Sequence, residues 1–227
     1  MRSAKLGGVI FDGANLSGAN LQEADFNEFS DSVFACNLPT HASLFEANLS
    51  GANLSDADLH YINLNSANLS EANLSYAELN DAKLQKTNLS GANFKNTNLS
   101  FADLSGANLQ NTNLRGNDLD YVKMRAVKLM GANLSGASLK SVDLTWANLS
   151  NTNLKGANLQ NASFWMTNLQ NANLKGANLQ KAYLKKANFR GANLEGANLQ
   201  GAIYSESTVF PKGFDPSANK ALLKPEY

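Results

Sequence analysis

The sequence predicts an all-β solenoid, a fold made of one short unit repeated along the chain. From Leu44 to Leu199 every fifth residue is apolar, with 28 Leu, three Phe and one Met in 32 successive pentads. The position two residues earlier holds 22 Ala, five Thr, three Val, one Ile and one Asn, and Asn separates the two columns in 20 of the 32 pentads. Each unit can bury its apolar face only against copies of itself, so this period indicates stacked repeats.

Each pentad is predicted to be a very short strand followed by a corner. Side chains two apart in an extended chain point the same way, so the small column and the Leu column share the inner face. The next inward residue is three positions further on, which requires a bend. Gly, Ser, Asn, Asp and Lys dominate the two positions after each Leu, and these residues tolerate tight turns. A strict period of five fits no helix.

Four pentads are predicted to make one circuit. The column that starts at Asn53 and recurs at every fourth pentad is Asn at all eight positions, and the Asn48 column is Asn at seven of eight. The column from Ser43 to Tyr183 holds a single Asn, Asn63. One side of the rod is therefore poor in Asn. On the other sides, outward Asn is expected to hydrogen-bond to its copies above and below and to the local turn backbone.

The A(N/D)LXX pattern, as in Ala47-Asn48-Leu49, resembles the pentapeptide-repeat proteins, and the resemblance covers residues 9–204. It implies a right-handed quadrilateral β-helix with four pentads per coil, Ala near the inner corners and Leu or Phe on the axis. At a coil spacing of about 4.8 Å, about nine to ten coils would form a rod roughly 45 Å long. The Phe-Pro-x-Gly-Phe-Asp-Pro run near the end resembles the tails of many cyanobacterial members.

Three segments depart from the repeat. Residues 1–8 are a lead-in, and residues 27–41, where the register shifts by three, are interpreted as an irregular coil or a protruding loop. Residues 205–227 are expected to cap the C-terminal end, which would otherwise leave an unpaired edge. Asp215-Pro216 is a fair N-cap with Pro at the first helical position, so a short helical cap is predicted over 217–223.

The sequence offers no chemistry, and we expect neither an enzyme nor a metal or cofactor site. His41, His60 and the single Cys36 are too few for a metal cluster or a convincing nucleophile–base pair. One cysteine excludes an internal disulfide framework. No stretch is long enough for a membrane span, and the absence of an export signal favours the cytoplasm.

Charge is distributed unevenly along the chain. Residues 1–121 carry 14 acidic and six basic side chains, whereas residues 122–201 carry two acidic and ten basic ones. The net charge of zero therefore describes a rod that is acidic in one part and basic in the other. This arrangement could orient a charged partner, support a homodimer or end-to-end association, or reflect drift on a solvated surface.

Outward aromatic residues gather on the Asn-poor side or its flanking corners, beside several basic groups. Exposed apolar patches rimmed by charge tend to mark interfaces, and Trp, Tyr, Met and Arg are enriched in them. The alternative is that the tail or the 27–41 segment folds over this side. The candidate partner-binding residues are Tyr121, Lys123, Arg125, Lys128, Met130, Trp146, Trp165, Met166 and Tyr183.

These features favour a non-catalytic rod that presents its Asn-poor face to a protein partner. The resemblance adds a second hypothesis, because some pentapeptide-repeat proteins protect type II topoisomerases by imitating duplex DNA; here only the N-terminal half is acidic. A third hypothesis is binding of nucleic acid or another anionic surface by the basic half. The basic residues lie on several sides rather than along one groove, which disfavours it. A purely structural or stress-tolerance role also remains open.

Overall fold

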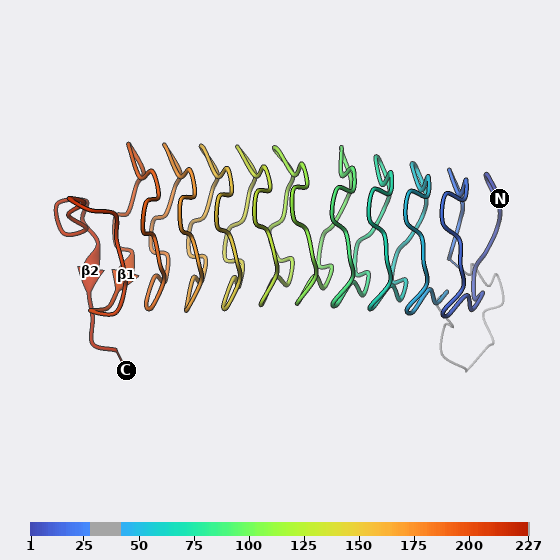
Figure 1. Cartoon of the computed structure of the whole chain (residues 1–227), viewed down its shortest axis with the longest axis horizontal. Helices are drawn as coiled ribbons and strands as arrows, with labels where there is room; N and C mark the ends of the chain where they lie inside the picture. The colour runs from blue at the N-terminus through green and yellow to red at the C-terminus, as the bar shows by residue number, and fades with distance from the viewer. Residues whose placement is uncertain (28–41, 227) are drawn as a thin grey trace, which may run out of the picture.

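The computed structural model describes residues 1–27 and 42–226, which form a rod of stacked coils with the chain ends at its opposite ends (Figure 1). Parallel bridges join most pentads to the fourth one after, as in Asn48 to Asn68 and Asn68 to Asn88. The circuit of four pentads predicted from the Asn columns is confirmed. The described residues contain no helix. The two named strands, β1 (Ile203–Tyr204) and β2 (Leu222–Leu223), form a parallel pair at the C-terminal end.

A tight turn closes each corner. The N–H of Ala47 donates to the carbonyl of Leu44 at 3.0 Å, and the same bond recurs in later pentads. The residue just before each Ala-column position has a positive φ, for example 54° at Glu46. These are features of a type II turn, which places its third residue in the left-handed region. Glycine occupies many of these positions, but so do large residues such as Tyr121 and Trp146.

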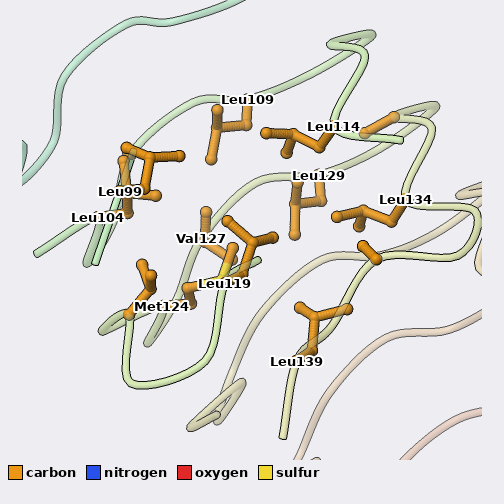
Figure 2. Close-up of a cluster of buried hydrophobic side chains, with 14 of the residues drawn as sticks. Leu99, Leu104, Leu109, Leu114, Leu119, Met124, Val127, Leu129, Leu134 and Leu139 are labelled. Carbon is orange, nitrogen blue, oxygen red and sulfur yellow. The ribbon is translucent and has the colours of Figure 1, made fainter. Parts of the chain in front are cut away.

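The Leu column fills the axis of the rod. Side chains from Leu99 to Leu139 point inward from successive coils and pack against one another (Figure 2). Threonines in the Ala column satisfy their hydroxyls inside this core: Thr152 Oγ1 donates to the Leu129 carbonyl at 2.8 Å and Thr167 Oγ1 to the Leu144 carbonyl at 2.7 Å. These buried hydroxyl groups therefore have partners, as burial requires.

The outward Asn side chains form the expected ladders. Asn68 Nδ2 donates to Asn48 Oδ1 at 3.2 Å, and Asn88 Nδ2 donates to Asn68 Oδ1 at 3.0 Å. Each Oδ1 also accepts the backbone N–H two residues on, as Asn48 does from Ser50 at 3.1 Å. Both roles predicted for Asn are present, so these residues are explained by the architecture.

The stack continues across the register shift. Ile10 pairs with Ser43 and Asn15 with Asn48, partners that lie further apart in sequence than the regular four pentads. The extra residues thus break the five-residue spacing in the sequence, but the ladder of parallel bridges between coils continues. Whether 27–41 is an irregular coil or a loop lies outside the described residues, since 28–41 are not among them.

The helical cap predicted over 217–223 is wrong. Asp215 does act as the expected cap, because its Oδ1 accepts the N–H groups of Ser217 at 2.8 Å and Ala218 at 3.2 Å. Lys220, however, has a φ of 61°, and the Ala221 N–H bonds back to the Pro216 carbonyl at 3.0 Å. This Schellman-type closure ends the turn at once. The chain then extends into β2, which pairs with β1 and continues the ladder.

Aromatic rings close the C-terminal end of the core. Phe210 stacks on Phe189 with ring centroids 5.5 Å apart and on Phe214 at 5.4 Å. Tyr204 meets the same ring edge-on at 5.4 Å. The end is therefore capped as expected, by a ring stack and an added strand.

Candidate partner-binding face

One side of the rod carries most of the candidate residues, and we call it the aromatic face. It consists of residues 101–106, 121–126, 141–146, 161–166 and 181–186, which stack because each segment is one circuit after the one before it. Its central positions include Asp143, Ser163 and Tyr183, joined in that order by parallel bridges. It corresponds to the Asn-poor side recognised in the sequence.

Corner geometry holds large apolar side chains outward on this face. Tyr121 is 70% exposed, Trp146 50% and Met166 47%. All three occupy corner positions with positive φ, at 66°, 62° and 55° respectively. A bulky residue in the left-handed region is uncommon and costs conformational free energy. The presence of large apolar residues at these three corners is therefore explained neither by burial in the core nor by the backbone conformation.

Ring and cation contacts link the face from one coil to the next. Phe101 stacks on Tyr121 at 5.7 Å, and Trp146 lies against Trp165 at 5.6 Å. The Trp146 indole N–H also donates to the Met166 sulfur at 3.4 Å. These contacts hold the exposed rings in fixed positions along the rod.

Basic groups flank the rings. The Arg125 guanidinium lies 4.9 Å from the Trp146 ring centroid, and Lys186 Nζ lies 5.7 Å from that of Trp165. Arg125 also forms an ion pair with Asp143 at 2.9 Å. Partial burial opposes ionisation of Asp143, but hydrogen bonds from Thr145 and Arg125 outweigh it and lower the pKa of its carboxyl group. The face is therefore apolar and basic, with Asp143 ionised.

The structure brings seven of the nine candidates together and separates two. Lys128 and Met130 lie beyond the corner at Ala126, on the adjoining side, where Lys128 takes a place in the ladder between Asn108 and Asn148. Grouping them with the aromatic cluster was wrong, because the chain turns between positions 125 and 128. The seven candidates on the aromatic face are Tyr121, Lys123, Arg125, Trp146, Trp165, Met166 and Tyr183.

Two lysines that the sequence reasoning missed also belong to this face. Lys185 Nζ lies 5.4 Å from the Tyr183 ring, and Lys186 contacts Trp165 as described above. The four-pentad period could have found Lys186, since it occupies the corner that follows Trp146 and Met166 in the same column.

The tail covers only one end of the aromatic face. Lys185, 7% exposed, donates to the Pro225 carbonyl, and Lys186 pairs with Glu226 at 3.2 Å. Tyr121 and Trp146 remain exposed among the described residues. The alternative that the tail covers the aromatic cluster is therefore wrong for these two side chains. The alternative that the 27–41 segment covers it concerns residues outside the described part of the chain.

Within residues 1–27 and 42–226, no group of three or more His, Cys, Asp or Glu side chains is placed to hold a metal ion. Cys36 and His41 are outside these ranges. No helix in the described ranges is long and apolar enough to cross a membrane.

Comparison with known families gives one consistent result. Residues 1–29, 40–60, 128–165, 137–176 and 167–203 match the family model described as pentapeptide repeats, in eight copies. Residues 57–134 match a second model, described as a pentapeptide repeat region. A search of curated proteins finds no match.

Solved structures of similar proteins include HetL, a pentapeptide repeat protein involved in heterocyst differentiation regulation from the cyanobacterium Nostoc sp. strain PCC 7120. It is 36% identical, with 85% of this chain and 81% of HetL covered and a TM-score of 0.43. A second pentapeptide repeat protein from Nostoc is 34% identical over 54% of this chain and 84% of its own, with a TM-score of 0.34. QnrB1, a plasmid-mediated fluoroquinolone resistance protein, is 21% identical over 98% and 87%, with a TM-score of 0.46.

Proposed function

The chain belongs to the pentapeptide-repeat family, whose members form right-handed quadrilateral β-helices, and on that premise we propose that it is a non-catalytic rod whose aromatic face binds a protein partner. The observation that carries the proposal is the set of large apolar side chains held outward at strained corners. Trp146 is half exposed although the same corner is occupied by Ser66, Lys86 and Gly106 in earlier coils.

The chemistry of the face indicates what it would bind. Exposed Trp and Tyr contribute large apolar area at low conformational entropy cost, and Arg beside them can pair with carboxylates. Lys123 and Arg125 lie between Tyr121 and Trp146 in sequence and on the same face. The partner surface is therefore expected to be apolar with acidic residues around it.

Family membership is consistent with such a role. Pentapeptide-repeat proteins are generally structural or interaction proteins rather than enzymes. HetL is described as involved in the regulation of differentiation, a type of role that a protein without a reaction of its own can perform. We extend to this chain only a role without a reaction of its own; that it binds another protein rests on the aromatic face.

Site-specific crosslinking tests the proposal. A photoreactive residue at Met166, 47% exposed on the aromatic face, is expected to crosslink to a defined partner in cells. Adding Trp146→Ser and Tyr121→Ser should abolish that crosslink. The matched control is Tyr76→Ser, since Tyr76 is 48% exposed, has a φ of 62° and lies near Lys95 at 5.7 Å, but belongs to another corner. Equal crosslinking in the double variant and the control would rule out the aromatic face.

The DNA-mimic alternative makes a different prediction. A mimic must present negative charge, whereas the aromatic face carries Lys123, Arg125, Lys181 and Lys186. The likeness to QnrB1, at 21% identity, bears on the fold alone. A supercoiling assay with a type II topoisomerase separates the two functions: inhibition or protection that survives Trp146→Ser would favour the mimic.

A further inference from the structure

The ladder between coils opens on the side of the rod opposite the aromatic face and on the adjoining side, as far as the corner at Phe101. Along most of the regular rod, N–H groups of one coil donate to carbonyls of the next, as Leu74 does to Asn93 at 2.9 Å. Between residues 94–101 and 113–120 these bonds are absent in the described chain, and the two coils stand visibly wider apart (Figure 1). The N–H groups left without a hydrogen-bond partner there belong to Asn96, Leu99, Phe101 and Asp118.

The side-chain ladder is interrupted at the same place. Asn93 Nδ2 donates to Asn73 Oδ1 at 3.0 Å and Asn133 Nδ2 to Asn113 Oδ1 at 3.3 Å, but no such bond joins Asn113 to Asn93 within the described residues. The two coils stay in register, since Asn93 and Asn113 still form a bridge. The opening is thus a local parting of two coils that remain aligned.

Asn117 lies where the coils part. It is the single Asn in the Ala column, whose other positions hold Ala, Thr, Val or Ile. It lies in the coil after Phe94, which is one of three Phe in the Leu column. Its Nδ2 reaches between the coils and donates to the Phe94 carbonyl at 3.1 Å. Thr97 makes the equivalent bond to Leu74 at 2.7 Å with a shorter side chain, and the ladder stays closed there. The longer amide and the larger ring thus lie together where the coils part.

The opening forms a polar cavity of about 380 Å³. Lys95 and Arg115 line it, and neither has a carboxylate within salt-bridge distance in the described part of the chain. Asn96 and Asp118, two residues with unbonded N–H groups, line it as well, and so does Asn113. The Asp118 carboxylate is the one negative group among the described lining residues, and its Oδ1 accepts the Asp120 N–H at 3.0 Å.

We propose that this inter-coil cleft is a binding site for a tetrahedral oxyanion, free or carried on a small hydroxylated molecule such as a sugar phosphate. Two cations and the unbonded N–H groups of Asn96 and Asp118 supply the donors that phosphate and sulfate require. Unbonded carbonyls such as that of Arg115 are left to accept from hydroxyl groups of the same ligand. A backbone N–H or carbonyl group without a hydrogen-bond partner costs free energy, so a ligand or water is expected to bond to those that solvent can reach in the cleft.

The chain contains a matched control for the site. Lys155 and Lys175 occupy the same column as Lys95 and Arg115, further along the same side. There the ladder is closed, with Leu154 donating to Asn173 at 2.8 Å and Gly156 to Lys175 at 3.0 Å. Lys155, like Lys95 and Arg115, has no ion pair among the described residues, whereas Lys175 pairs with Glu195 at 2.8 Å, so Lys155 is the control cation.

Titration of the full chain with inorganic phosphate, glucose 6-phosphate and glucose tests the proposal, with binding followed by calorimetry and by the amide resonances of Asn96 and Asn113. The phosphate-bearing ligands are expected to bind saturably, and glucose not to bind. Lys95→Gln and Arg115→Gln should each weaken binding roughly tenfold, as loss of a charge-assisted hydrogen bond does, and Lys155→Gln should leave it unchanged. Asp118→Asn should tighten it. Tighter binding of glucose 6-phosphate than of phosphate identifies the esterified source, and the reverse identifies the free ion.

Asn117→Ala provides the decisive variant, because it introduces the usual residue of its column and keeps both cations. We expect it to close the ladder, slow hydrogen exchange at the Asn96 amide and abolish binding. Failure of both phosphate ligands to shift the Asn96 and Asn113 amides would overturn the proposal. So would wild-type binding by Asn117→Ala, or equal losses in Lys155→Gln and Arg115→Gln.

Discussion

The guanidinium of Arg125 lies over the indole of Trp146, 4.9 Å from the ring centroid, although the two residues belong to successive coils. The same guanidinium pairs with Asp143 at 2.9 Å. One arginine therefore fixes both an exposed ring and a carboxylate on the aromatic face, and this contact can be tested directly.

Replacing Arg125 by Gln removes the cation from above Trp146. Loss of the cation–π contact is expected to lower the free energy of unfolding by about 0.5–1 kcal/mol, the range for exposed sites, and to shift the tryptophan emission. Lys123→Gln is the control, since Lys123 is exposed two residues before Arg125 but lies over neither tryptophan. Urea titration followed by fluorescence measures both effects, and identical spectra for the two variants would contradict this assignment.

Asp143 should make stability depend on pH. Its pKa in the folded protein is below the reference value of 3.8, so its ionised form stabilises the fold above that pH, and the contribution is lost as pH falls through the lowered pKa. We expect Asp143→Asn to be less stable than wild type at pH 7. The difference in free energy of unfolding should shrink steadily below about pH 3.8. A difference that stays constant down to pH 2 would show that the carboxylate charge has no part in it.

Corner positions should discriminate among substitutions by backbone preference. Gly136 has a φ of 67°, and a Cβ added there would meet nothing within 4 Å. Gly136→Asn is therefore expected to be nearly neutral, because Asn already occupies corners such as Asn151 and Asn161. Gly136→Val should lower the free energy of unfolding by about 1–2 kcal/mol, since a β-branched residue tolerates this region poorly. Equal stability of the two variants by urea titration would argue against a strained corner.

Phe210 should control the stability of the C-terminal coil. Phe210→Ala removes the ring between Phe189 and Phe214 and is expected to cost about 3 kcal/mol, as truncation of a packed Phe does. Hydrogen exchange at the Phe189 amide, which donates to Val209 at 2.6 Å, should become faster. Exchange near the N-terminal coils should not change, because each coil contacts only its neighbours. Phe45→Ala, at a 37% exposed ring far from the cap, is the control.

Local features of the structure were predictable where they depend on spacing alone. The five-residue columns predicted corners, an inner Leu axis and circuits of four pentads, because an extended chain alternates its side chains and must bend to bring the next Leu inward. The same count placed Tyr121, Trp146 and Met166 on one side. It failed for Lys128 and Met130 because they are close to Arg125 in sequence, whereas the corner at Ala126 turns them onto another side.

The tail shows a different limit. Asp215-Pro216 begins a turn as its residues indicate, but the left-handed conformation of Lys220 ends it, and the unpaired edge of β1 takes up Leu222 and Leu223 as β2. Backbone groups at an edge gain more from a ladder partner than a short isolated helix gains from its own bonds. Nothing within residues 217–223 encodes the presence of that edge.

The sequence by itself thus determined the repeat, the direction of each side chain and the Asn-poor side, since these depend on chain geometry within a few residues. Only the tertiary structure decided which outward residues meet across coils, that two coils part beside Asn117, and how the tail joins the ladder. Those outcomes depend on how the coils stack and on what space and unpaired backbone groups the stack leaves, and residues far apart in sequence set both.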